Sequence, residues 1–150
     1  MFLTEKWMTY ALSAAMLWGA SYAASGPVLR SGMTPVVFYF CYSLFGVITA
    51  SGMLLFRGEA HQVISQISDL RAYAGWFVFS LLAAALGGVM TYMAIGEKNA
   101  SLVALIEISY PLFVVLFTWL FFREIQLNVM TLAGAVLVIS GIALILLNER

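Results

Sequence analysis

Apolar residues run along the chain in long blocks, and polar residues are confined to short stretches between them. A helix that crosses the hydrocarbon core of a bilayer needs about 20 mostly apolar residues. Five windows have about this length: Trp7 to Leu29, Met33 to Phe56, Trp76 to Ile95, Leu102 to Phe122 and Val129 to Leu147. The pattern therefore predicts an all-α, polytopic membrane protein, with five transmembrane helices in one domain over residues 1–150.

The composition agrees with a membrane location. The chain is 63% hydrophobic and 9% charged, with a mean hydropathy of +1.00, whereas soluble domains carry about 25% charged residues. The connections between the windows are too short to hold a soluble domain, so any function lies in the helices and their rims.

The longest connection reads RGEAHQVISQISDLRAYAG, from Arg57 to Gly75. Its apolar residues recur at helical spacing with polar residues between them: Val63, Ile64, Ile67 and Leu70. This pattern favours a short helix on the membrane surface, although a tether without function fits it too. His61 has no Cys, Asp or Glu at ligand spacing, so no metal site is expected.

Positive charges are nearly balanced between the two faces that five spans define. One face holds Lys6, Arg57, Arg71 and Arg123, and the other holds Arg30, Lys98 and Arg150. A chain with one fixed orientation shows a clear Lys and Arg excess on its cytoplasmic side. We therefore expect either dual insertion and an antiparallel homodimer, or a weakly oriented chain, N-terminus in the cytoplasm, that pairs with an inverted partner.

Small residues mark two helix faces that allow close packing. The last window contains GAVLVISGI, in which Gly134 and Gly141 lie seven residues apart and share a face. We expect this pair to form a dimer seam. The third window has a comparable set, for which packing inside one bundle and packing across a dimer are both open: Ala83, Ala84, Gly87, Gly88 and Thr91.

The order of several motifs resembles an EamA repeat of the drug/metabolite transporter superfamily. The matching features are the Trp18-Gly19 pair in LWGASYAASGPVLR, the small residues from Asn99 to Ser101, Pro111, Glu124, and the Gly134 to Gly141 pair. Most members carry two such repeats with inverted halves, whereas this chain has one. It therefore resembles the single-repeat, five-helix members, and GAVLVISGI is similar to the last helix of small multidrug resistance transporters, which forms dimers.

The resemblance implies a multi-pass protein of a cell membrane, the bacterial inner membrane. It also implies a secondary transporter, an exporter or exchanger of small organic metabolites or drug-like solutes, that works by alternating access as a dimer. The alternative is a non-transport membrane protein, such as a lipid-handling factor or the accessory half-subunit of a heterodimeric transporter. The partners expected are a small-molecule solute, the lipid bilayer and a second chain.

Glu107 is the one formal charge inside the stretch SLVALIEISYPLFVVLFTWLFF. It lies about 10 Å along the helix axis, and a charge near the helix centre costs about 3 kcal/mol. Pro111 has no N–H, so it cannot bond the carbonyl of residue 107 and should kink the helix. Tyr110 shares the face of Glu107. We predict a carboxyl that lines a solute cavity and exchanges a proton or a cation; a rim position or a helix-capping role is the alternative.

Aromatic residues fall into two groups by depth. Trp18, Tyr22 and Ser25 form one stripe in the middle of the first window, which suits the wall of a cavity that stacks on a ligand, although core packing explains it equally well. Tyr92 is a further candidate of this kind. The other tryptophans lie near the ends of windows, as an interfacial belt does: Trp7, Trp76 and Trp119.

Other classes of function find no support in the sequence. No Ser/His/Asp set, Cys/His cluster or phosphate-binding glycine loop is present, so we expect neither an enzyme nor a cofactor. The net charge is zero and no basic cluster exists, so nucleic-acid binding is not expected. Cys41, the single cysteine, is expected to be a small buried hydrophobe.

Overall fold

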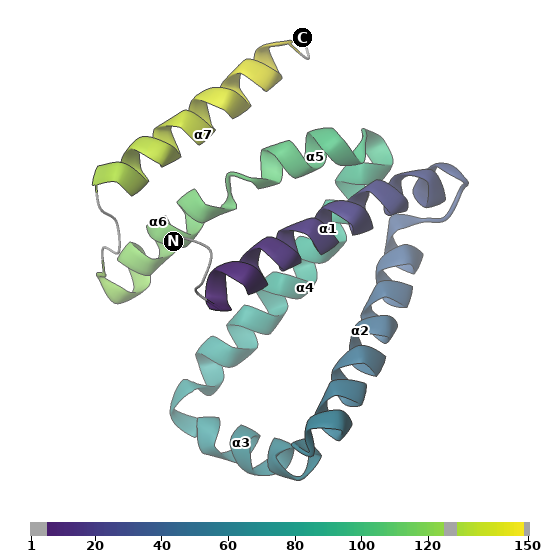
Figure 1. Cartoon of the computed structure of the whole chain (residues 1–150), viewed down its shortest axis with the longest axis vertical. Helices are drawn as coiled ribbons and strands as arrows, with labels where there is room; N and C mark the ends of the chain where they lie inside the picture. Colours follow the sequence, from purple (N-terminus) through teal and green to yellow (C-terminus); the bar gives the residue numbers. More distant parts are fainter. Residues whose placement is uncertain (1–5, 125–128, 149–150) are drawn as a thin grey trace. The chain divides into compact units, whose positions relative to one another are not determined.

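Helices make up the ordered elements in the part of the chain that the computed structural model describes, residues 6–124 and 129–148 (Figure 1). The long elements are α1 (Lys6–Arg30), α2 (Pro35–Arg57), α4 (Ala74–Glu97), α6 (Tyr110–Phe122) and α7 (Val129–Asn148). The short ones are η1 (Ala60–Gln62), α3 (Val63–Asp69), η2 (Leu70–Tyr73) and α5 (Ala100–Glu107). The prediction of an all-helical protein is confirmed.

Helices occupy all five predicted windows, and within the described residues three helical stretches are long and apolar enough to cross a membrane. These are Pro35–Arg57, Ala60–Glu97 and Ala100–Phe122. α7 contains a shorter apolar stretch, Ala133–Ile145. The structure thus supports three candidate membrane spans of the five predicted. The chain divides into two compact units, residues 23–99 and residues 1–22 with 100–150.

The unit of residues 23–99 contains an antiparallel pair, α2 and α4, joined by η1, α3 and η2 (Figure 1). Local chemistry sets the ends of α2. The Thr34 hydroxyl oxygen accepts a bond from the Val37 N–H at 3.4 Å, and Pro35 occupies the first turn, where its missing N–H has no consequence. At the other end Gly58 takes the left-handed conformation, φ 69°, which a glycine adopts without steric cost.

α2 and α4 pack through one glycine and a group of aromatic rings. A Cβ on Gly88 of α4 would lie 2.5 Å from Cε2 of Tyr39 on α2, so only glycine lets this ring approach. Phe38, Tyr39 and Tyr42 also surround Tyr92, with ring centroids 4.7, 6.2 and 5.7 Å away. Gly88 therefore packs against a helix of its own chain, and of the two alternatives left open above, packing inside the chain is the one observed for this residue.

The second unit contains the first part of α1 together with α5, α6 and α7. The fourth predicted helix is interrupted: α5 ends at Glu107, Ile108 and Ser109 form a turn, and α6 begins at Tyr110. Tight bonds bracket this break, from Ser109 N–H to the Ile106 carbonyl at 3.1 Å and from Leu112 N–H to the Ser109 carbonyl at 3.0 Å. The fourth predicted span is therefore still one candidate stretch, Ala100–Phe122, but it consists of two helices in sequence.

The interfacial belt of tryptophans stays a prediction, whereas the expected burial of Cys41 is contradicted. Trp7, Trp76 and Trp119 are exposed near the ends of α1, α4 and α6, and the Arg123 guanidinium lies 5.4 Å from the ring centroid of Trp119. Such amphipathic rings suit the headgroup layer. Cys41, in contrast, is exposed on α2. Its predicted burial is wrong because an apolar segment of a membrane protein presents apolar residues outward as well as inward.

Candidate functional site

Tyr22 and Glu107 form the central contact of the candidate site. The Tyr22 hydroxyl, on α1, donates a hydrogen bond of 2.8 Å to Oε2 of Glu107 at the end of α5. Both residues belong to the unit of residues 1–22 and 100–150 and are partly buried. A phenolic hydroxyl is both a donor and an acceptor, and a carboxylate offers about four lone-pair sites, so this pair can bind further donors.

The break between α5 and α6 places the Glu107 carboxyl beside non-helical backbone, within an apolar segment. Glu107 is the last residue of α5, and the turn at Ile108 and Ser109 separates it from α6. Because Pro111 has no N–H, the Glu107 carbonyl cannot receive the bond that a continuous helix would provide. Non-helical backbone at membrane depth occurs where it is buried in protein or lines a water-filled cavity. The carboxylate and the end of α5 together attract positive charge.

Two more predicted residues lie in the same unit. Trp18 packs edge-on against Tyr22, with ring centroids 5.7 Å apart and an interplanar angle of 66°, and it is 47% exposed. Its indole therefore lies beside the Tyr22 ring with part of its surface open. Tyr110 begins α6 and is 66% exposed. The donor paired with Glu107 is thus a tyrosine of another helix, rather than the tyrosine three residues along the chain.

The remaining predicted binding residues lie in the other unit. Ser25 is 1% exposed in the last turns of α1. Tyr92 is 1% exposed, inside the aromatic group formed with Phe38, Tyr39 and Tyr42. The structure thus brings together Trp18, Tyr22 and Glu107, and gives Tyr92 dense aromatic surroundings.

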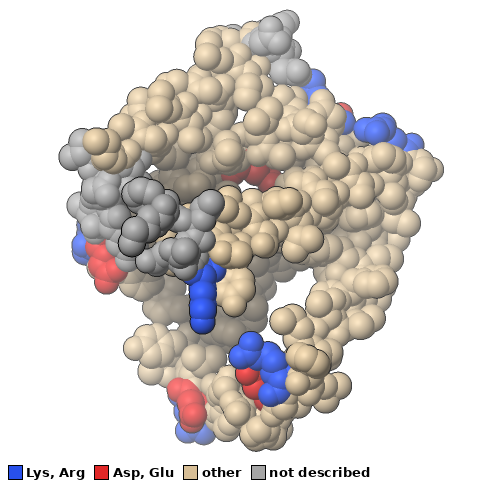
Figure 2. Space-filling view, in the orientation of Figure 1, with Lys and Arg blue, Asp and Glu red and all other residues tan. Residues whose placement is uncertain are grey.

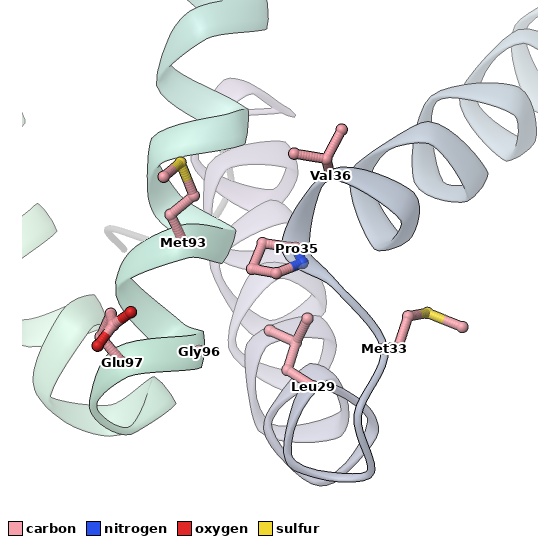
Figure 3. Close-up of a pocket in the computed structure, with 7 residues that line it drawn as sticks. All are labelled: Leu29, Met33, Pro35, Val36, Met93, Gly96 and Glu97. Atoms are coloured by element: carbon pink, nitrogen blue, oxygen red, sulfur yellow. The ribbon is translucent and has the colours of Figure 1, made fainter.

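A separate pocket of about 320 Å³ lies where α1 ends, α2 begins and α4 ends, all within residues 23–99 (Figure 3). Its lining residues are Leu29, Met33, Pro35, Val36, Met93, Gly96 and Glu97. Figure 3 shows Pro35 between Met93 and Leu29, with Met33 and Glu97 located at opposite sides of the view. The volume is at the lower end for small-molecule sites, and none of the predicted binding residues lines it.

The chemistry of the site is that of one carboxyl and its tyrosine donor. Among residues 6–124 and 129–148, no group of three or more His, Cys, Asp or Glu side chains could hold a metal ion. A carboxyl beside a tyrosine hydroxyl can accept and release a proton, or bind an organic cation, and Trp18 adds an aromatic face for the same cation.

Sequence reasoning missed the aromatic residues around Tyr92 and the partner of Glu107. The run FYFCY places Phe38 and Tyr42 at i and i+4, on one helix face, which is a signal that could have found the group. The bond between Tyr22 and Glu107 joins residues 85 positions apart. No local pattern predicts such a pair.

Comparison with known proteins confirms the resemblance. The profile of the EamA-like transporter family matches residues 5–147, nearly the whole chain. Neither a curated protein nor a solved structure gives a significant match. Together with its membrane-crossing helices, the match over this length shows that the chain belongs to the EamA-like transporter family.

Proposed function

We propose that this protein is a secondary transporter, an exporter or exchanger of small organic solutes, that couples solute movement to proton exchange at Glu107. Amine-like, amino-acid-like and drug-like compounds are the substrate class, because a carboxyl beside Trp18 and Tyr22 suits a cationic group on an organic body. The membrane is a cell membrane, the bacterial inner membrane.

The observation that carries the proposal is the bond between Tyr22 and Glu107 at the α5–α6 break. In many secondary transporters, broken helices form the sites for substrate and coupling ion. Ionisable residues inside membrane segments are expensive, and they mark ion or substrate pathways by default. In the proposed cycle Glu107 alternates between a protonated state and a state bound to a solute cation, and Tyr22 holds the carboxyl in place.

The proposed topology has five crossings, with α1 and α7 added to the three candidate spans, and two chains that face in opposite directions. The near-equal positive charges of the two faces, four against three, support it. So does α7, where a Cβ on Gly134 or Gly141 would meet no described atom within 4 Å. The seam of the dimer is then the Gly134–Gly141 face of α7.

Reconstitution of the purified chain tests the transport proposal. A pH-sensitive dye inside vesicles reports proton movement when a panel of organic amines and amino acids is added outside. We expect at least one solute to drive proton flux, and Glu107→Gln, which keeps the shape and removes titration, to abolish that flux. Unchanged flux in Glu107→Gln would remove the carboxyl from the mechanism. A chain active only after a second, related chain is added would favour the accessory half-subunit.

The orientation is tested with a reporter fused to the C-terminus. We expect reporters on both faces of the membrane, and enrichment of N-terminus-in molecules in Lys98→Ala, because this change alters the balance from four against three to four against two. If every C-terminus lies on one face in cells that make no related protein, the inverted homodimer is wrong.

A further inference from the structure

The connector, residues 60–73, joins α2 to α4, and these two helices determine its depth in the membrane. α2 ends at Arg57, and α4 begins at Ala74, directly after η2. Pro35–Arg57 is one candidate membrane span, and the next stretch, Ala60–Glu97, contains both the connector and α4. At 38 residues this stretch is longer than the roughly 20 residues that one crossing needs, and α4 alone has 24. A segment that joins two antiparallel spans lies where both leave the hydrocarbon. Figure 1 shows η1, α3 and η2 crossing from one helix to the other at this end of the unit.

One side of α3, continued by Leu70 at the start of η2, is apolar and partly exposed. At 100° per residue, Val63, Ile64, Ile67 and Leu70 fall within an arc of about 120°. Ile64 is 80% exposed and Ile67 is 56% exposed, whereas Val63 and Leu70 are half-buried. Ile64 and Ile67 thus form the exposed edge of the arc, and Val63 and Leu70 form its half-buried edge.

The other side of α3 is polar and bonded within the connector. Gln66 Nε2 donates to Gln62 Oε1 at 3.0 Å, and the Ser65 hydroxyl donates to the Gln62 carbonyl at 2.9 Å. These bonds hold the polar groups on the side away from Ile67. α3 is therefore a short amphipathic helix with a defined apolar edge.

The charges around the connector balance. The Arg57 Nε lies 2.7 Å from Oε1 of Glu59, and Asp69 and Arg71 contribute opposite charges two residues apart. Figure 2 shows side chains of both signs gathered at the α3 end of this unit, next to helices without charge. A protein partner that binds by charge finds no excess of either sign here, and an anionic lipid surface is attracted weakly at most.

We propose that the connector binds the interface of its own membrane by inserting Ile64 and Ile67 among the lipid chains, and that this insertion does not require anionic lipid. The occupant of the apolar edge is the bilayer, because the ends of α2 and α4 hold the connector at headgroup depth and two exposed isoleucines are favourable there. Tyr73, the last residue of the connector, and Trp76, in the first turn of α4, are exposed and are the residue types that anchor segments at this depth. This inference uses only the two flanking spans and is independent of the transport proposal.

Fluorescence quenching tests the proposal. Cys41→Ser provides a chain without cysteine, into which Ile64→Cys or its neighbour Ser65→Cys is introduced for labelling with a polarity-sensitive dye. The labelled chains are reconstituted in phosphatidylcholine vesicles. Lipids brominated on the acyl chain should quench the dye at position 64 at least threefold more than the dye at position 65, and aqueous iodide should show the reverse order. A second pair, Ile67→Cys and Asp69→Cys, should repeat the result if either first variant folds poorly, because Asp69 is exposed on the side of the helix opposite Ile67.

Three results would overturn the proposal. Equal quenching at the two positions would mean that α3 does not lie in the interface. Protection of position 64 from both quenchers would mean that protein, such as a second copy of this chain, covers the edge. Lipid quenching that appears only after anionic phosphatidylglycerol is added would mean that charge, rather than hydrophobic insertion, holds the connector.

Discussion

The hydroxyl of Tyr22 donates a 2.8 Å hydrogen bond to the carboxyl of Glu107, across 85 residues of sequence. The acceptor lies at the end of α5, immediately before the turn that separates α5 from α6. In an apolar chain this pair places a titratable group and its donor at an interruption of a membrane helix. The first two predictions concern the two halves of this arrangement.

Tyr22→Phe should keep the carboxyl and remove its donor. A hydrogen bond to a charged group contributes about 1.5–3 kcal/mol, which corresponds to a rate loss of about tenfold or more if the bond positions Glu107 in the rate-limiting step. We expect slower solute-driven proton flux that still occurs, unlike the complete loss in Glu107→Gln. Tyr10→Phe, on an exposed part of α1, is the matched control and should transport at the normal rate. Equal rates in the two phenylalanine variants would show that Tyr22 does not position the carboxyl.

Pro111→Ala should restore the N–H that a continuous helix donates to the carbonyl of Glu107. We expect α5 and α6 to straighten toward one helix and transport to slow several-fold, while the thermal stability of the detergent-purified protein does not fall. Pro35→Ala is the control, because Pro35 also lies in the first turn of a helix but no helix directly precedes it. Normal transport by Pro111→Ala would mean that the break is not needed for function.

Gly88→Ala should destabilise the α2–α4 pair. The new Cβ would lie 2.5 Å from Cε2 of Tyr39, and Tyr39 lies among other rings, so the ring must move. Overpacking of this kind costs about 1–3 kcal/mol, which equilibrium unfolding in mixed detergent can measure. Gly87→Ala offers the comparison, since no described atom lies within 4 Å of its added Cβ. Adjacent glycines with equal effects would contradict the close approach of Tyr39.

Gly141→Leu should weaken the dimer that the proposed function requires. The substitution fills the face on which Gly134 also lies, while inside the chain it meets no described atom within 4 Å of the added Cβ. We therefore expect less cross-linked dimer in the membrane, with helix content unchanged by circular dichroism. Ala143→Leu adds comparable bulk on the opposite side of α7, where the side chain is exposed, and should leave the dimer intact. A dimer that resists Gly141→Leu but is lost in Ala143→Leu would place the seam on the other face.

The sequence by itself determined where the helices are. Helices occupy each of the five apolar windows, because a long apolar stretch in a bilayer must satisfy its backbone bonds internally, and this requirement acts on each segment separately. The family resemblance was equally accessible, since it rests on the order of short motifs and is confirmed over residues 5–147. The amphipathic connector was also predicted, from local spacing alone.

Only the tertiary structure decided which side chains meet. Proline chemistry predicted a kink, but the turn at Ile108 and Ser109 became visible only in the folded chain. The close approach of Tyr39 to Gly88 also became visible only there. The same holds for the hydrogen bond to Glu107, which comes from Tyr22 rather than from Tyr110. The physical reason is that hydropathy and helical period describe the surroundings of a residue along its own segment. Contacts between segments depend on how helices pack, and in a chain where nearly every helix face is apolar, the pattern does not distinguish the face that meets protein from the face that meets lipid.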